Sequence, residues 1–132
     1  MDKVALVELL RSRVDGLLAI YAFGSRVQGT AGEGSDLDLA VLVKGYVDPL
    51  VLWEIASEAA DIAGCPVDLL DLRRASTVMQ QQVLTKGERW WAVRGDEAGL
   101  FECAVLSEKL ELDRARAPLL RDIERDGRVY GR

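Results

Sequence analysis

Two spacings of hydrophobic residues dominate the first third of the chain. Near its start, apolar residues recur every three or four positions among charges: Val4, Val7, Leu10 and Val14. This spacing predicts an amphipathic helix over residues 3–14. Leu17 to Phe23 and Asp36 to Val43 are instead short, nearly continuous apolar runs, which is typical of buried strands. We therefore expect a helix followed by two strands.

The rest of the chain alternates between the same two patterns. A Pro, a Ser and two Gly residues mark where helices start or stop: Pro49, Ser76, Gly64 and Gly87. The predicted elements are a helix over 50–63, a strand over 66–72, a helix over 76–86, a strand over 89–93, and helices over 97–116 and 119–125. Strands interleaved with helices favour an α/β (α+β) fold with a small mixed sheet packed by helices.

Composition is consistent with one domain over residues 1–132. The chain is 49% hydrophobic and 30% charged, a balance expected of a globular domain with its own core. We assign the sheet and the active site to about residues 1–93 and the C-terminal helices to about 97–126. No apolar run approaches a bilayer span and no secretory h-region is evident, so we expect no membrane association and a cytoplasmic protein.

Charge and residue types exclude several kinds of chemistry. A net charge of −5 argues against direct nucleic-acid binding, which needs an excess of Lys and Arg. The two cysteines, Cys65 and Cys103, are far apart and indicate neither a disulfide framework nor a thiolate zinc site. The chain has no histidine, so His-based nucleophilic catalysis and His-ligated zinc are excluded. Carboxylates, hydroxyls, Lys or Arg must carry any reaction.

Asp36 and Asp38 form the first candidate site. Alternate residues of a strand point to the same face, so these two carboxylates share one small volume. Their mutual repulsion favours either solvent exposure or a bound divalent cation. Mg²⁺ fits best, because it takes one or two carboxylates and completes its octahedron with water and phosphate oxygens.

Gly24 and Ser25 end the first predicted strand just upstream of these acids. A glycine lets a backbone approach a phosphate closely, and a serine hydroxyl can donate to a phosphate oxygen. We therefore expect a nucleoside triphosphate to bind here. Arg26 and Ser35 are further candidates for the same nucleotide site, although the residue type of Arg26 favours a solvated or salt-bridged side chain over a phosphate ligand.

A third carboxylate is expected from the strand over residues 66–72. Asp68 and Asp71 are three positions apart and so lie on opposite faces of a regular strand. We favour Asp68 as the site residue and expect Asp71 to cap the strand end or to pair with Arg73 or Arg74. Asp68 would then complete a metal cluster and serve as general base toward an incoming hydroxyl.

The adjacent residues Trp90 and Trp91 would face opposite ways on a regular strand, so that at most one belongs to the core. The other could contact a partner or pack partly on the surface.

Together these motifs resemble a known family. Gly24-Ser25, ten residues and then Asp36-Leu37-Asp38, followed by the strand PVDLLDL, resemble the polymerase-β-like nucleotidyltransferase superfamily. The compact length is most similar to its minimal members, the MNT-type antitoxins. The resemblance implies a triphosphate held by Gly24 and Ser25, Mg²⁺ bound by Asp36 and Asp38, and a third acid at Asp68.

The same resemblance implies a function. We expect transfer of AMP from ATP to a tyrosine of a cognate HEPN RNase toxin, with this chain acting as the antitoxin and forming a complex with the toxin. Two alternatives remain open at this stage. The chain could transfer a nucleotide to a small hydroxylated molecule, or it could mask a toxin by contact alone, without catalysis.

Overall fold

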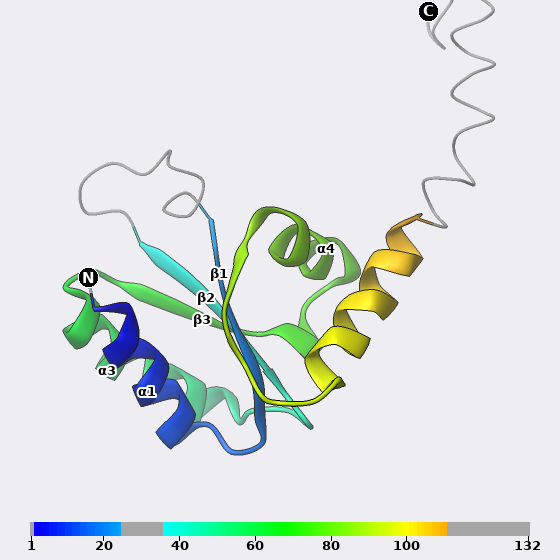
Figure 1. Cartoon of the computed structure of the whole chain (residues 1–132). Helices are drawn as coiled ribbons and strands as arrows, with labels where there is room; N and C mark the ends of the chain where they lie inside the picture. Colours follow the sequence, from blue (N-terminus) through cyan, green and yellow to red (C-terminus); the bar gives the residue numbers. More distant parts are fainter. Residues whose placement is uncertain (1, 25–35, 111–132) are drawn as a thin grey trace, which may run out of the picture.

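Four strands form one mixed sheet at the centre of the molecule (Figure 1). The computed structural model describes residues 2–24 and 36–110. The strand order is β3-β2-β1-β4. The strands are β1 (Leu17–Phe23), β2 (Leu37–Val43), β3 (Val67–Asp71) and β4 (Glu88–Ala92). β2 runs antiparallel to β1 and parallel to β3, while β4 pairs antiparallel with β1. The expected mixed sheet is therefore confirmed.

Helices cover both faces of this sheet. They are α1 (Lys3–Arg13), α3 (Pro49–Ala63), the short 3₁₀ helix η1 (Leu72–Arg74), α4 (Thr77–Lys86) and a helix over residues 97–110. The expected end signals act as capping residues. The Ser76 hydroxyl accepts a hydrogen bond from the Met79 amide of α4, and Gly64 ends α3 in the left-handed conformation, with φ of 74°.

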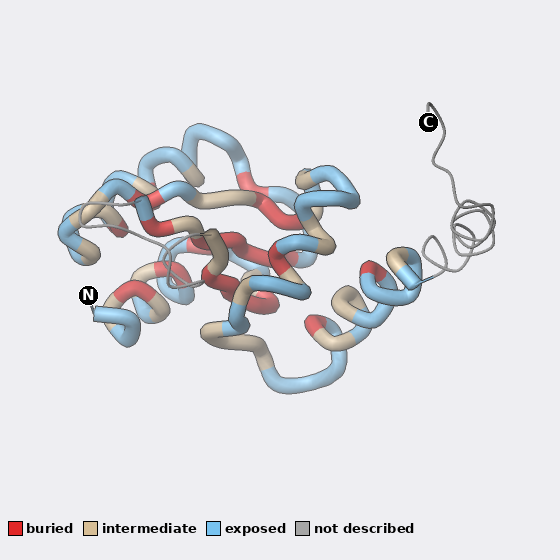
Figure 2. The backbone as a smooth tube through the Cα atoms, turned by 90° about the horizontal axis from the view of Figure 1, so that it is seen from above, coloured by how far each residue is buried: buried red, intermediate tan, exposed pale blue. Residues whose placement is uncertain are grey.

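Each face of the sheet has its own apolar core. On one face, alternate strand residues such as Ile20, Leu39 and Val41 pack with α1 and α3. On the other, the intervening residues, including Ala40 and Leu42, pack with α4 and helix 97–110. This alternation places Asp38 and Asp68 on the α4 face. Figure 2 shows the buried residues concentrated in the strands, between the two helical layers.

The prediction that Trp90 and Trp91 face opposite ways is wrong. Both side chains are half-buried, and both pack against the core on the α1 face. The pairing of β1 with β4 is irregular at this point: Ile20 pairs with Trp91, but the next residue, Tyr21, pairs with Arg89. The irregularity leaves Trp90 as an extra residue, so alternation fails there. Lys3 and Arg11 of α1 lie over the two indole rings.

Three remaining expectations concern the boundaries of elements and the possibility of a membrane span. Strand β2 begins at Leu37, one residue later than expected, so Asp36 immediately precedes it. Helix 97–110 agrees with the first part of the expected helix over 97–116, whereas its remainder and the helix over 119–125 lie outside the described residues. None of the helices in the described ranges is long and apolar enough to cross a bilayer.

Candidate active site

Asp38 and Asp68 stand side by side on neighbouring strands. They are direct partners in the parallel register of β2 and β3, and both project from the α4 face of the sheet. Their carboxyl groups lie within hydrogen-bonding reach of one another. The pairing of an inner strand, β2, with the edge strand β3 thus holds the two acids together.

The close approach of these acids changes the pKa of Asp38. Partial burial raises this pKa above the ordinary aspartate value, and the negative charges of Asp68 and Asp36 raise it further. The hydrogen bond with Asp68 acts in the same direction, because it requires a proton between the two carboxyls. The site therefore concentrates negative charge in a way that favours a cation between the acids.

Gly24 at the end of β1 is built around the Asp38 side chain. Its φ is 85°, in the region that favours glycine. A Cβ atom placed on Gly24 would overlap the Oδ2 atom of Asp38. We expected this glycine to allow the backbone to approach a phosphate. The structure shows in addition that it makes room for the carboxylate itself, so the turn and the acid pair form one site.

Not all of the other predicted site residues lie within the described residues. Asp36 lies just before β2, and its charge acts on Asp38, which brings it into the same acidic cluster. Ser25, Arg26 and Ser35 lie outside the described residues. Their assignment to the nucleotide site stays a prediction.

Asp71 lies apart from this pair, at the far end of β3. Its side chain is only 5% exposed. One carboxylate oxygen accepts a 2.9 Å hydrogen bond from the backbone amide of Val47 and lies 3.7 Å from the guanidinium of Arg74. These contacts fasten the loop after β2 to the end of β3. Asp71 thus has a structural role, with Arg74 as its ionic partner.

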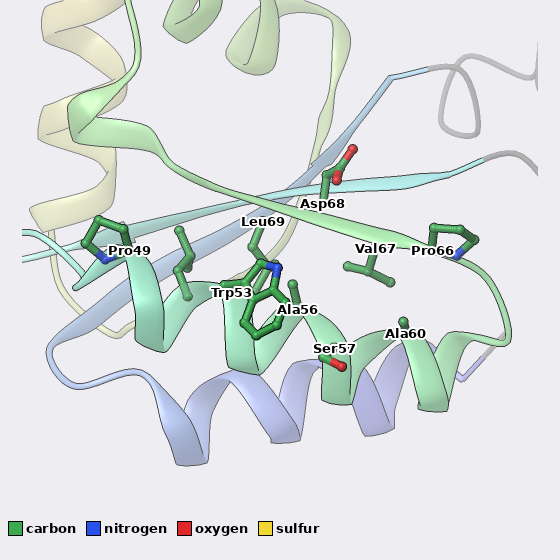
Figure 3. Close-up of a pocket in the computed structure, with 10 residues that line it drawn as sticks. Pro49, Trp53, Ala56, Ser57, Ala60, Pro66, Val67, Asp68 and Leu69 are labelled. Carbon is green, nitrogen blue, oxygen red and sulfur yellow. The ribbon is translucent and has the colours of Figure 1, made fainter.

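A groove of about 490 Å³ runs between the outer edge of β3 and α3. Figure 3 shows that Val67 and Trp53 lie on the groove side of the strand, whereas the carboxylate of Asp68 points away from α3. Trp53 is 73% exposed. The groove therefore borders the acid pair without containing its carboxylates.

The residues present fit a hydrated metal ion rather than a preformed protein cage. Among the described residues, no three acidic side chains converge tightly enough to enclose a metal by themselves. Mg²⁺ does not require this, because it is usually held by one or two carboxylates and by substrate phosphates. Asp38 with Asp68, and Asp36 beside them, supply that donor set. Such a site suits phosphoryl or nucleotidyl transfer.

Comparison with known proteins agrees with this geometry. The family model of polymerase β nucleotidyltransferases matches residues 5–91. The matched range includes Asp38 and Asp68 and all of the sheet except the last residue of β4. The chain belongs to this family. The nucleotidyltransferase family match ends before helix 97–110 begins.

Individual relatives extend the likeness over nearly the whole chain. A protein adenylyltransferase MntA from Shewanella oneidensis is 39% identical over 123 residues, which cover 93% of this chain and 88% of the relative. An MntA from Aphanizomenon flos-aquae is 26% identical, with 93% of each chain covered.

Solved structures show the same relationship. A toxin–antitoxin complex with AMP-PNP contains a chain that is 36% identical, with a TM-score of 0.77 and coverage of 94% of this chain and 99% of that one. The MNT antitoxin bound to a tri-AMPylated Shewanella oneidensis HEPN toxin matches with a TM-score of 0.70, 34% identity, and coverage of 92% and 95%.

Sequence reasoning missed two features near the site. The contact between Gly24 and Asp38 depends on the antiparallel pairing of β1 and β2, in which Phe23 lies opposite Asp38; the only local signal was a glycine at a strand end. The second feature is the exposed Trp53 beside the groove. Trp53 does not follow the spacing of the buried residues of α3, and this mismatch in the sequence could have indicated that its side chain is exposed.

Proposed function

We propose that this nucleotidyltransferase is a cytoplasmic, Mg²⁺-dependent enzyme that transfers AMP from ATP to a tyrosine hydroxyl of a HEPN-domain toxin, and so acts as its antitoxin. The observation that carries the proposal is the pair Asp38 and Asp68, held in register with Gly24 packed against Asp38. The named activity of the MntA relatives, and a relative's complex with a tri-AMPylated HEPN toxin, support the acceptor.

Asp38, Asp68 and Asp36 would hold the metal. When bound, Mg²⁺ supplies positive charge against the triphosphate and the developing charge on the leaving group. The acids of this chain fix where that charge sits, because β2 and β3 set their spacing. Metal binding favours the ionised form of Asp38 and so opposes the rise in the pKa of this group that burial and the neighbouring acids cause.

The reaction is a balanced displacement at the α-phosphorus of ATP. The hydroxyl oxygen forms a bond to this phosphorus while the bond to the bridging oxygen of pyrophosphate breaks, and pyrophosphate leaves with that electron pair. Asp68 is placed at the outer side of the pair, on the edge strand, where an acceptor can approach. It accepts the hydroxyl proton as general base. Gly24 and Ser25 would hold the triphosphate, with Arg26 and Ser35 as further candidates.

The proposal is tested with the HEPN protein expected to be encoded beside this chain's gene. The purified pair is incubated with Mg²⁺ and ATP, and the intact mass of each chain is followed, alongside Asp38→Asn and Asp68→Asn variants. We expect AMP increments on the HEPN protein, located to a tyrosine by peptide mapping, and a loss of at least about 100-fold in rate for either variant.

Three outcomes would contradict the proposal in different ways. Increments that persist in both variants would remove the acids from the chemistry. A stable complex that blocks the toxin without any increment would favour contact alone. Neither complex nor increment, with nucleotide transferred to a small hydroxylated compound such as an aminoglycoside, would favour the small-molecule reaction.

A further inference from the structure

Helix 97–110 presents one face to the sheet and a different apolar face to solvent. Its inner residues Ala98 and Val105 are buried, and Phe101 packs on the core of the α4 face. A second row of small or apolar residues follows a spacing of four, three and four positions: Gly99, Cys103, Leu106 and Leu110. We call this row the outer stripe. The spacing keeps its members on one side of the helix, as in the contact seam of a coiled coil.

The outer stripe is open in this structure. Leu106 is 39% exposed and Leu110 is 50% exposed, and a Cβ atom placed on Gly99 would meet no atom within 4 Å. Beside the first half of the stripe lies a hollow of about 460 Å³, bordered by Gly99 and Cys103 and by residues of β4 and the loop that follows it. A ridge of leucines next to a hollow is suited to a partner helix that places one side chain in the hollow.

Polar contacts hold the helix so that this stripe faces outward. The Tyr21 hydroxyl of β1 donates a 2.7 Å hydrogen bond to Glu102, and Arg89 of β4 lies 3.0 Å from the same carboxylate. Glu102 thus ties the helix to two strands at once. The helix belongs to the same face of the sheet as Asp38, because Ala40 and Leu42, which share that face, pack in one cluster with Ala98.

The comparisons indicate which kind of protein covers the stripe. The nucleotidyltransferase family match ends at residue 91. An alignment of 123 residues with the Shewanella relative, in a chain of 132, must nevertheless take in most of the segment beyond that point. Structures of toxin–antitoxin complexes match 92–94% of this chain as well. The helix is therefore shared with antitoxins that bind toxins, and it is not part of the matched catalytic domain.

We propose that the outer stripe of helix 97–110 is the surface that docks the toxin partner, through a helix of the partner laid along Leu106 and Leu110. The inference rests on the proposed function for the identity of the partner. Docking on the α4 face would bring the acceptor hydroxyl to the side of the sheet from which Asp38 and Asp68 project. Binding and catalysis then use separate residues of this chain.

The test separates these two activities. The stripe variant Leu106→Glu/Leu110→Glu is compared with Ala104→Glu/Ser107→Glu, which adds the same charge at two exposed positions of the same helix outside the stripe. Binding to the neighbour-encoded HEPN protein is measured by interferometry without ATP. We expect the stripe variant to weaken binding by at least about 30-fold and the control by no more than about 2-fold, with ATP binding equal in both.

A stripe variant that binds the HEPN protein as tightly as the control would overturn the inference. Failure of the proposed function gives a different result. In that case the wild type and the Asp38→Asn/Asp68→Asn variant bind equally well and neither modifies the partner, while the stripe variant still fails to bind. If the wild type itself did not bind this protein, the assigned partner and the docking surface would both be wrong.

Discussion

The two faces of the sheet differ in the chemistry they carry. The face covered by α1 and α3 is lined by aliphatic strand residues such as Leu39 and Val41, which are fully buried. The opposite face carries aliphatic residues only in part. It also holds the acid pair Asp38 and Asp68, and the buried Tyr21 with its polar partner Glu102. Adjacent residues of one strand thus belong to surfaces of different kinds.

This difference separates the source of stability from the source of activity. Burial of aliphatic side chains on the α1 and α3 face provides a rigid support. The paired acids, by contrast, repel one another, so their geometry must be maintained by the rest of the fold. Asp38 and Leu39 are neighbours in sequence, and substitutions at these two positions should therefore have opposite consequences.

The largest effect on stability is expected for Leu39→Ala. This side chain is fully buried between the sheet and its helices, and its loss leaves a cavity. We expect the free energy of unfolding to fall by about 2–5 kcal/mol, measured by urea denaturation. AMP transfer per folded molecule should largely persist at low temperature. The matched contrast is Asp38→Asn, which should abolish transfer while leaving the fold intact. If both variants lost stability and transfer to similar extents, the two faces of the sheet would not have separate roles.

A smaller loss of stability is expected for Gly24→Ala, together with a local disturbance of Asp38 on the face of the sheet that carries the acid pair. Alanine at a φ of 85° is strained, which costs about 1–3 kcal/mol, and its Cβ atom would displace the Asp38 carboxylate. Gly64→Ala is the control, because Gly64 has a similar φ of 74° but open space around its Cβ position. Both variants should lose comparable stability in thermal melts, but only Gly24→Ala should lose AMP transfer. Equal transfer rates would show that the contact with Asp38 is unimportant.

Local patterns predicted the parts of this site that depend on one strand at a time. Strand alternation predicted that Asp68, rather than Asp71, shares a face with Asp38, and the capping residues were evident from their positions at the ends of the apolar patterns. What could not be predicted depends on pairing between distant segments. The irregular register between β1 and β4 turned Trp90 and Trp91 to one face, and no local pattern encodes that register. The contact of Gly24 with Asp38 likewise exists only because β1 and β2 pair.

The smallest loss of stability is expected for Tyr21→Phe. Tyr21 lies on the same face of the sheet as Asp38 and Asp68 but is not one of the acid pair. The phenol donates to Glu102, and losing this partly buried hydrogen bond should cost about 0.5–1.5 kcal/mol near neutral pH. Burial raises the pKa of Tyr21 well above its ordinary value, and the hydrogen bond to Glu102 raises it further.

The pH dependence of this variant carries a definite sign. In the unfolded chain Tyr21 ionises near its ordinary pKa of about 10, whereas in the folded protein it stays protonated, so the wild type loses stability as pH rises past that value. Phenylalanine has no proton to lose. The stability difference between wild type and Tyr21→Phe should therefore shrink in alkaline solution, as measured by urea denaturation across the alkaline range with Tyr46→Phe, an exposed tyrosine, as control. A difference that stays constant with pH would mean that Tyr21 ionises as readily in the folded protein as in the unfolded chain.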